Sequence, residues 1–174
     1  MKIACVQMDI AFGEPEKNFA VADKYIKEAA KAGADVIVLP EMWNTGYALN
    51  DLSSLADANG EKTKQLLMES AKQYGVNIVG GSVATKKEDG FYNTMYVANR
   101  KGEIIAEYDK AHLFKLMDEH LFMNSGQKAN LFEIDGNTYL SRLIFQNESI
   151  PQELAPSHMG VAGRHRAMSL SRSG

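Results

Sequence analysis

The 174-residue sequence has few of the features that mark several large protein classes. It contains one cysteine, so no disulfide can form within the chain, and a disulfide-stapled secreted domain is excluded. No apolar run approaches the roughly 20 residues that cross a bilayer as a helix. Residues 1–6 lack the long apolar region of a signal peptide. These absences predict a cytoplasmic protein without a membrane partner.

The sequence also lacks a strong excess of either charge. Its formal net charge is -3 at pH 7 and its pI is near 5.8. A nucleic-acid-binding domain usually carries a basic surface, so no nucleic acid is expected as the main partner. Hydrophobic residues make up 45% and charged residues 24%, as in ordinary globular proteins. The length is sufficient for one domain with its own core.

Lysine is missing from the last part of the chain. Residues 1–140 hold 14 lysines and one arginine, whereas residues 141–174 hold no lysine and four arginines. The net charge changes accordingly from -5 (15 basic minus 20 acidic) to +2 (4 basic minus 2 acidic). Residues 160–174 are small, polar and aperiodic, which predicts disorder or weak structure there. We therefore expect two parts, residues 1–136 and a divergent tail of residues 137–174.

The apolar residues predict alternating strands and helices. Short runs rich in β-branched residues indicate strands, and apolar residues that recur every three or four positions indicate helices. The strands are predicted at residues 2–8, 35–39, 76–81, 93–99, 103–108 and 130–134, and the helices at residues 15–31 and 61–74. This order is typical of a layered α/β fold with an at least partly parallel sheet.

Two charged side chains follow predicted strands, where ligands bind in open α/β sheets. Glu41 follows the strand at 35–39, where a partly desolvated carboxylate suits a general base, although a capping or loop acid is commoner. Lys110 follows the strand at 103–108, and an ammonium in a confined site can stabilise a developing oxyanion. Most lysines are instead solvated surface charges. His112 is expected to pack or hydrogen-bond as a structural group rather than to act in catalysis.

Five short blocks occur in order along the first part of the chain. They are Lys-Ile-Ala-Cys-Val-Gln-Met at residues 2–8, Gly-Ala-Asp-Val-Ile-Val-Leu-Pro-Glu at 33–41, Asn-Ile-Val-Gly-Gly-Ser at 77–82, Tyr-Asn-Thr at 92–94 and Tyr-Asp-Lys-Ala-His-Leu-Phe at 108–114. Together they resemble the carbon–nitrogen hydrolases of the nitrilase superfamily, over residues 1 to about 136. The resemblance implies part of a four-layer α-β-β-α sandwich whose C-terminal half is missing or replaced.

The resemblance implies roles for three residues. Glu41 matches the general base that activates a cysteine thiol, and Lys110 matches the lysine that steadies the tetrahedral intermediate. Glu119 matches a second glutamate that helps to position the site, although the residue alone favours a solvated helix acid. The implied reaction is attack of a thiolate on a small amide or nitrile, followed by hydrolysis of the thioester. The resemblance implies no metal or organic cofactor, and it implies a homo-oligomer.

The chain departs from the family at the nucleophile. The family cysteine ends the next strand, which corresponds here to residues 139–145, and this segment contains no cysteine. Ile144 stands near the expected position. Ser141 and Ser149 are nearby hydroxyls that nothing in the sequence marks as activated. Cys5 lies inside the first predicted strand, where a small, buried and inert side chain is expected. The chain is therefore expected to be catalytically incomplete.

Three explanations of the tail stay open: a shift of reading frame, a truncation and true divergence. A shift near codons 137–148 accounts for both the changed composition and the missing cysteine. Residues 149–151 can be encoded so that the next frame reads Arg-Phe-Pro, which follows the cysteine in the family. Half a domain exposes a sheet edge and an apolar face, so instability, aggregation or rescue by a partner is expected.

Three functions are compatible with these features. The first is a carbon–nitrogen hydrolase by descent that acts on a small amide. The second is a non-catalytic module that binds a small amide or carboxylate, and the third is an unrelated α/β ligand-binding domain.

Overall fold

The computed structural model of the chain describes residues 1–128, 131–140 and 166–170. In chain order the elements are β1 Lys2–Val6, α1 Pro15–Lys31, β2 Val36–Val38, the 3₁₀ turn η1 Leu49–Asp51, α2 Leu52–Leu55, β3 Asp57–Ala58, α3 Glu61–Tyr74, β4 Asn77–Val79, β5 Val83–Lys87, β6 Gly90–Ala98, β7 Ile104–Asp109, the 3₁₀ turn η2 Lys115–Met117, α4 Glu119–Phe122, β8 Leu131–Ile134, β9 Asn137–Leu140 and β10 Arg166–Leu170. Both predicted helices are confirmed, and each predicted strand has a counterpart.

Eight strands form one mixed sheet within the described part of the chain. β1, β2 and β4 are parallel, and Ile37 pairs with Ala4 on one side and with Ile78 on the other. β6 is antiparallel to its neighbours β4, β5 and β7. The hairpin β8–β9 forms a separate two-stranded sheet. The predicted α/β fold with a partly parallel sheet is confirmed, whereas the complete four-layer sandwich stays a prediction.

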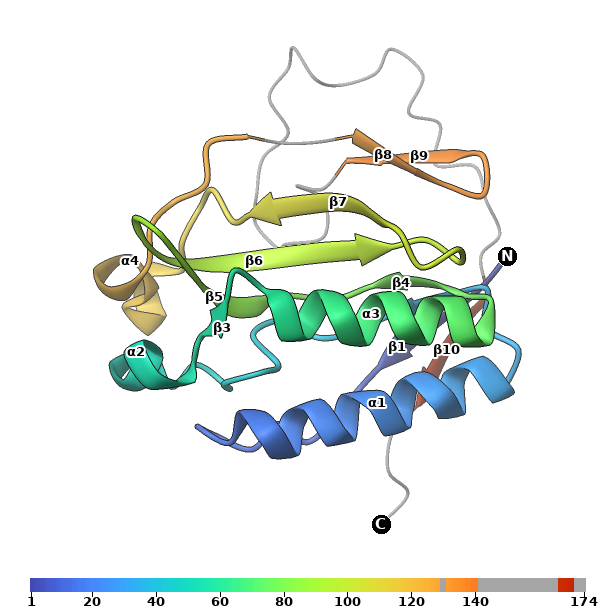
Figure 1. Cartoon of the computed structure of the whole chain (residues 1–174), viewed down its shortest axis with the longest axis horizontal. Coiled ribbons are helices and arrows are strands. Elements are labelled where there is room, and N and C mark those ends of the chain that lie inside the picture. Colours follow the sequence, from blue (N-terminus) through green and yellow to red (C-terminus); the bar gives the residue numbers. More distant parts are fainter. Residues whose placement is uncertain (129–130, 141–165, 171–174) are drawn as a thin grey trace.

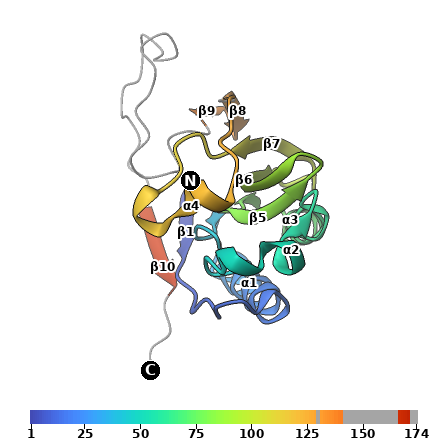
Figure 2. The same cartoon turned by 90° about the vertical axis from the view of Figure 1, so that its left-hand side faces the viewer.

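Helices α1 and α3 cover one face of the sheet, and the hairpin β8–β9 lies on the opposite side (Figures 1 and 2). Phe19 and Ile26 recur on one side of α1 and are buried. They pack with Ala4 of β1 and Ile37 of β2 in the core between the helices and the sheet. Among the described residues, no helix is both long and apolar enough to cross a membrane.

The opposite face of the sheet carries a second apolar cluster, which the hairpin partly covers. Val36 and Val79 of the parallel strands pack there with Tyr108 of β7 and with Phe132 and Ile134 of β8. A cavity of about 180 Å³ lies between sheet and hairpin, and it is lined by Met1, Ile3, Val36, Val38, Val79, Phe132, Ile134 and Tyr139. The sheet is thus packed tightly on its helical face and less completely on the other.

The expectation that Cys5 is buried is wrong, because its side chain is exposed. Successive side chains of a strand point to opposite faces of the sheet. Ala4 and Val6 point into the core beneath the helices. Cys5 therefore points to the other face, where it meets solvent. A short apolar strand predicts burial of its residues on average, but it does not tell which face is covered.

The expectation of disorder or weak structure in residues 160–174 is not met over Arg166–Leu170, which form β10 parallel to β1. A strand at the edge of a sheet presents unpaired backbone N–H and C=O groups that can pair with another extended segment. Such pairing depends on the backbone, so side-chain periodicity does not reveal it. The features expected at Ser141, Ile144 and Ser149 lie outside the described residues.

Candidate active site

Glu41, Lys110 and Glu119 meet at the carboxyl ends of the parallel strands. Glu41 lies in the loop after β2, Lys110 directly follows β7, and Glu119 begins α4. The Lys110 Nζ donates hydrogen bonds to Glu41 Oε1 at 2.7 Å and to Glu119 Oε2 at 3.0 Å. The fold therefore brings all three predicted site residues into one hydrogen-bonded group.

Asn93 of β6 completes this group. Its Nδ2 donates to Glu119 Oε1 at 2.6 Å and to Glu41 Oε1 at 3.2 Å. Asn93 belongs to the Tyr-Asn-Thr block at residues 92–94, but no role was predicted for it, and its spacing carries no signal that points to one. We call Glu41, Asn93, Lys110 and Glu119 the site cluster.

The members of the site cluster differ in their exposure. The Lys110 side chain is 6% exposed and that of Glu119 is fully buried, whereas that of Glu41 is 40% exposed. Glu119 Oε2 also accepts the backbone N–H of Phe114 at 2.7 Å. The alternative that Glu119 is a solvated helix acid is therefore wrong. Glu41 is the carboxylate that keeps contact with solvent.

Electrostatic interactions hold the Lys110 side chain in its charged form. Burial by itself lowers the pKa of this ammonium, because the charged form loses hydration. The hydrogen bond and negative charge of Glu41, together with those of Glu119, outweigh burial and raise the Lys110 pKa above its ordinary value. The site therefore presents a cation at neutral pH, as stabilisation of an oxyanion requires.

The loop that carries Glu41 is held by the turn between β4 and β5. The Ser82 N–H donates to Pro40 O at 3.1 Å, and Ser82 Oγ accepts the Met42 N–H at 3.1 Å. Gly81 has a φ of 58°, and a Cβ there would lie 1.9 Å from Pro40 O. Only glycine permits this approach without a shift of the backbone. These contacts fix the residues on both sides of Glu41.

Tyr47 lies beside the site cluster and was not predicted as a site residue from the sequence. Burial raises the pKa of its hydroxyl, and the charges of Glu41 and Glu119 and a hydrogen bond with Glu41 raise it further. Its φ of 65° is unusual for an aromatic residue and is typical of strained functional loops. The only signal in the sequence is its place in the same loop as Glu41.

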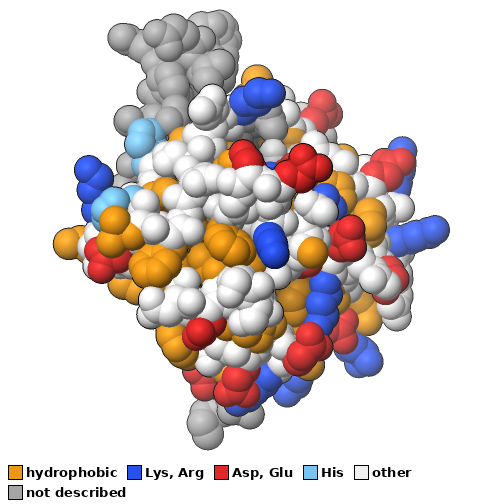
Figure 3. Space-filling model, turned by 60° about the vertical axis from the view of Figure 1, so that its left-hand side comes forward, with side chains coloured by type: hydrophobic (Ala, Val, Ile, Leu, Met, Phe, Trp, Pro, Cys, Tyr) orange, Lys and Arg blue, Asp and Glu red, His pale blue; other side chains and the backbone are white. Residues whose placement is uncertain are grey.

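The residues after Lys110 form an apolar surface next to the site. His112 is exposed, so its structural role stays a prediction. Leu113 is partly buried and packs with Met42 and Met123. Hydrophobic side chains gather beside the histidines on this face (Figure 3). The exposed large side chains of this segment are Phe114, Leu116, Met117, Leu121 and Phe122.

A hollow of about 580 Å³ lies elsewhere on the sheet, lined by Asp89, Tyr92, Glu107, Asp109, Ser125, Gly126, Gln127 and Lys128. Lys87 Nζ contacts Asp109 Oδ1 at 2.8 Å and Glu107 Oε1 at 2.9 Å, so these acids already have a cation. We therefore place the candidate site at the site cluster. Within the described ranges, no group of three or more His, Cys, Asp or Glu side chains is arranged to hold a metal ion.

Comparison with known proteins gives related enzymes and structures. Residues 2–144 match the carbon–nitrogen hydrolase family. The chain is 50% identical over 134 residues to the 2-oxoglutaramate amidase of Bacillus subtilis (strain 168), a match that covers 77% of this chain and 51% of the amidase. It is 36% identical over 163 residues to a hydrolase in the agr operon of Staphylococcus aureus, covering 92% of this chain and 62% of that protein.

Solved structures agree with these sequence matches. A nitrilase-superfamily protein from Saccharomyces cerevisiae matches with a TM-score of 0.71 and 25% identity over 79% of this chain and 53% of that chain. A CN-hydrolase superfamily protein from Xanthomonas campestris matches with a TM-score of 0.69 and 26% identity, over 76% and 49%. The chain spans about half the length of the relatives it matches. It belongs to the carbon–nitrogen hydrolase family of the nitrilase superfamily.

Proposed function

We propose that the site cluster is the amide-hydrolysing site of a carbon–nitrogen hydrolase, here without its thiol nucleophile. The observation that carries the proposal is the contact of Lys110 Nζ with both Glu41 and Glu119. The substrate class is a small amide, such as the omega-amide of a short acid. The 50% identity to a 2-oxoglutaramate amidase supports this choice.

Each member of the site has one task in the proposed reaction. Glu41, the more exposed carboxylate, takes the proton of the thiol, and the thiolate attacks the amide carbon. Lys110 stabilises the oxyanion, and buried Glu119 holds Lys110 in place. The carbon–nitrogen bond then breaks, the amine leaves with the proton, and water hydrolyses the thioester. No step requires a metal or an organic cofactor.

The position of the only cysteine favours a second candidate function for this chain. Cys5 lies within β1, and residues 139–145 contain no cysteine. The carboxylates and the ammonium are nevertheless assembled. The chain as written can therefore bind a small amide or carboxylate without turnover. We also propose that the chain is divided into residues 1–136 and a divergent tail, and that it forms a homo-oligomer.

Sequencing the gene from codon 130 to well past codon 174 tests the hydrolase proposal first. If a shifted frame encodes a cysteine before Arg-Phe-Pro-Glu, the restored protein is expected to hydrolyse a small omega-amide. Glu41→Gln and Lys110→Ala should each abolish this activity, whereas Glu69→Gln, an exposed glutamate on α3, should leave it unchanged. A restored enzyme that keeps its activity in both site variants contradicts the assignment.

Calorimetric titration of the 174-residue chain with a small amide and with its carboxylate tests the binding candidate. Binding is expected in the parent chain and in Glu69→Gln, and it should be lost in Glu41→Gln. A folded, monomeric chain that binds neither compound rules this candidate out.

A further inference from the structure

We infer that Asn93 is a positioning residue of this site, whose side-chain amide holds Glu41 and Glu119 on either side of Lys110. This inference deepens the proposed function and rests on it for its purpose. The proposed reaction assigns a task to three members of the site cluster and none to Asn93. The contacts of Asn93 nevertheless reach all three.

The Asn93 amide nitrogen carries two hydrogens and has a carboxylate for each. It donates to Glu119 Oε1 at 2.6 Å and to Glu41 Oε1 at 3.2 Å. The backbone carbonyl of Asn93 accepts the backbone N–H of Lys110 at 2.9 Å. Lys110 Nζ bonds the same two carboxylates, so the four residues form a closed ring of hydrogen bonds. Displacing Asn93 therefore removes one hydrogen bond from each carboxylate and leaves Lys110 as the contact that they share.

A second buried asparagine shows what a purely structural amide looks like. Asn44 is fully buried, as Asn93 is. Its Nδ2 donates to Ala84 O at 3.0 Å, and its Oδ1 accepts the Ala84 N–H at 2.8 Å. Both ends of the Asn44 amide are thus satisfied, and they join the Glu41 loop to β5.

The Asn93 amide is satisfied on its donor side only. Its Oδ1 is buried and has no hydrogen-bond partner within the part of the chain that the structure describes. A buried acceptor without a partner is costly, and such groups are rare in native structures. The amide therefore keeps an orientation that is unfavourable for the fold but presents both hydrogens to Glu41 and Glu119.

The chemistry of the site explains why a neutral double donor fits this position. Two carboxylates that share one ammonium repel each other. A second cation would neutralise Glu41 and weaken it as a proton acceptor, and a carboxylate would add to the repulsion. A primary amide brings the two carboxylates together without adding charge. Glu41, which is 40% exposed, otherwise has water as an alternative partner.

Titration of the Lys110 side chain by NMR tests the inference. Glu41 and Glu119 are the charged groups that raise the Lys110 pKa against the effect of burial. In Asn93→Leu, Glu41 should turn toward solvent, and the Lys110 pKa should fall. The proton affinity of Lys110 should decrease about tenfold. Asn44→Leu removes an equally buried amide with no carboxylate contact. It should lower stability but shift the Lys110 titration less than Asn93→Leu does, because among the described residues the Asn44 side chain bonds only the backbone of Ala84.

A second background separates positioning from general disruption of the core. In a Glu41→Gln chain, the effect of Asn93→Leu on the Lys110 pKa should shrink to less than about half. Asn93→Ala serves if the leucine variant does not fold. The inference is overturned if the folded Asn93 variants titrate as the parent does, or if Asn44→Leu shifts Lys110 equally. The measurement requires neither substrate nor thiol, so its outcome is independent of amide binding or hydrolysis.

Discussion

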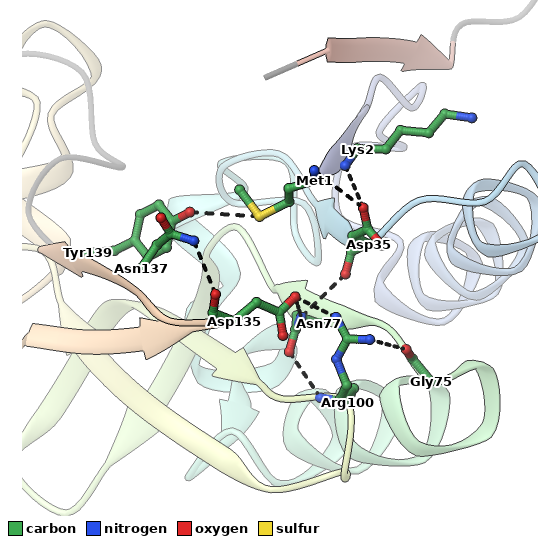
Figure 4. Close-up of polar contacts among 9 residues, drawn as sticks. All are labelled: Met1, Lys2, Asp35, Gly75, Asn77, Arg100, Asp135, Asn137 and Tyr139. Carbon is green, nitrogen blue, oxygen red and sulfur yellow. Dashed lines mark hydrogen bonds and ion pairs between the residues drawn. The ribbon is translucent and has the colours of Figure 1, made fainter. Parts of the chain in front are cut away.

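Two polar clusters lie at opposite ends of the parallel strands and differ in how their charges are matched. The far cluster, at the amino ends, consists of Asp35, Asn77, Arg100 and Asp135 (Figure 4). There Asp135 pairs with Arg100, and Asp35 lies 3.9 Å from the N-terminal ammonium of Met1. Each carboxylate thus has its own cation. In the site cluster, Glu41 and Glu119 share one cation among the described residues, Lys110.

The two clusters also differ in how deeply their charged side chains are buried. The Arg100 and Asp135 side chains are 43% and 36% exposed, against 6% and 0% for Lys110 and Glu119. Exposed, balanced pairs add little stability, and here they join the turns of two hairpins to the sheet. Buried charges of unequal number cost stability, and such sites are typical of chemistry rather than of architecture. The comparison favours a functional role for the site cluster and a structural role for the far cluster, which attaches the hairpin turns to the sheet.

Removing the cation from each cluster should have the most unequal effect. Lys110→Met leaves the buried Glu119 without its counter-charge and should lower the free energy of unfolding by about 3–5 kcal/mol. Arg100→Met, in the exposed cluster, should lower it by at most about 1 kcal/mol. Urea denaturation of both variants and the parent provides the measurement. Equal losses would show that burial does not distinguish the clusters.

Two glycines allow the same comparison for the backbone. Gly75, whose carbonyl accepts Arg100 Nη1 in the far region, has a φ of 66° and no atom within 4 Å of an added Cβ. Gly75→Ala should cost about 1 kcal/mol through its backbone conformation alone. At Gly81 the new Cβ would also meet Pro40 O at 1.9 Å. Gly81→Ala should therefore cost more than about 2 kcal/mol in thermal or urea unfolding, and a smaller loss would argue against a rigid Glu41 loop.

Alkaline pH should weaken the site end through Tyr47 and Lys110. Burial and then Glu41 raise the Tyr47 pKa above its ordinary 10.0. Burial lowers the Lys110 pKa, but its carboxylates raise it above 10.5. The folded chain therefore binds these protons more tightly than the unfolded chain, and stability falls as pH rises past these values, by up to about 1.4 kcal/mol per pH unit for each proton.

Urea titrations at pH 8 to 11 measure this slope. Tyr47→Phe should make it shallower. Arg100→Met should leave it unchanged, because a guanidinium does not lose its proton in this range. A slope that Tyr47→Phe leaves as steep as in the parent would contradict the account.

The smallest expected effect is at the far cluster itself. Asp135→Asn removes the charge that binds Arg100 and should cost at most about 1 kcal/mol, and this cost should shrink in high salt. The local effect should be larger, because Asp135 joins the hairpin β8–β9 to Asn77 of β4. Hydrogen exchange of residues 131–140 should accelerate. Unchanged exchange would mean that the apolar contacts of Phe132 and Ile134 suffice to hold the hairpin.

The comparison also shows which parts of the fold local sequence reveals. The bounds of α1 and α3 follow from the spacing of residues such as Phe19, Ile26 and Leu67, and Gly75 ends α3 in the left-handed conformation that glycine permits. Glu41 and Lys110 were found because each follows a strand. Asn93 and Tyr47 were missed as site residues, since their relevance depends on what lies beside them in space.

The sequence by itself determined both long helices, the order of these helices and six strands along the chain, and the family resemblance, because helical and strand periodicity and short motifs are local properties of the chain. Only the tertiary structure decided that Cys5 is exposed, that Glu119 is fully buried, and that one ammonium lies between two carboxylates. These properties depend on which surfaces meet when the strands pair. Burial then changes the energy of a charge far more than any neighbour along the chain does.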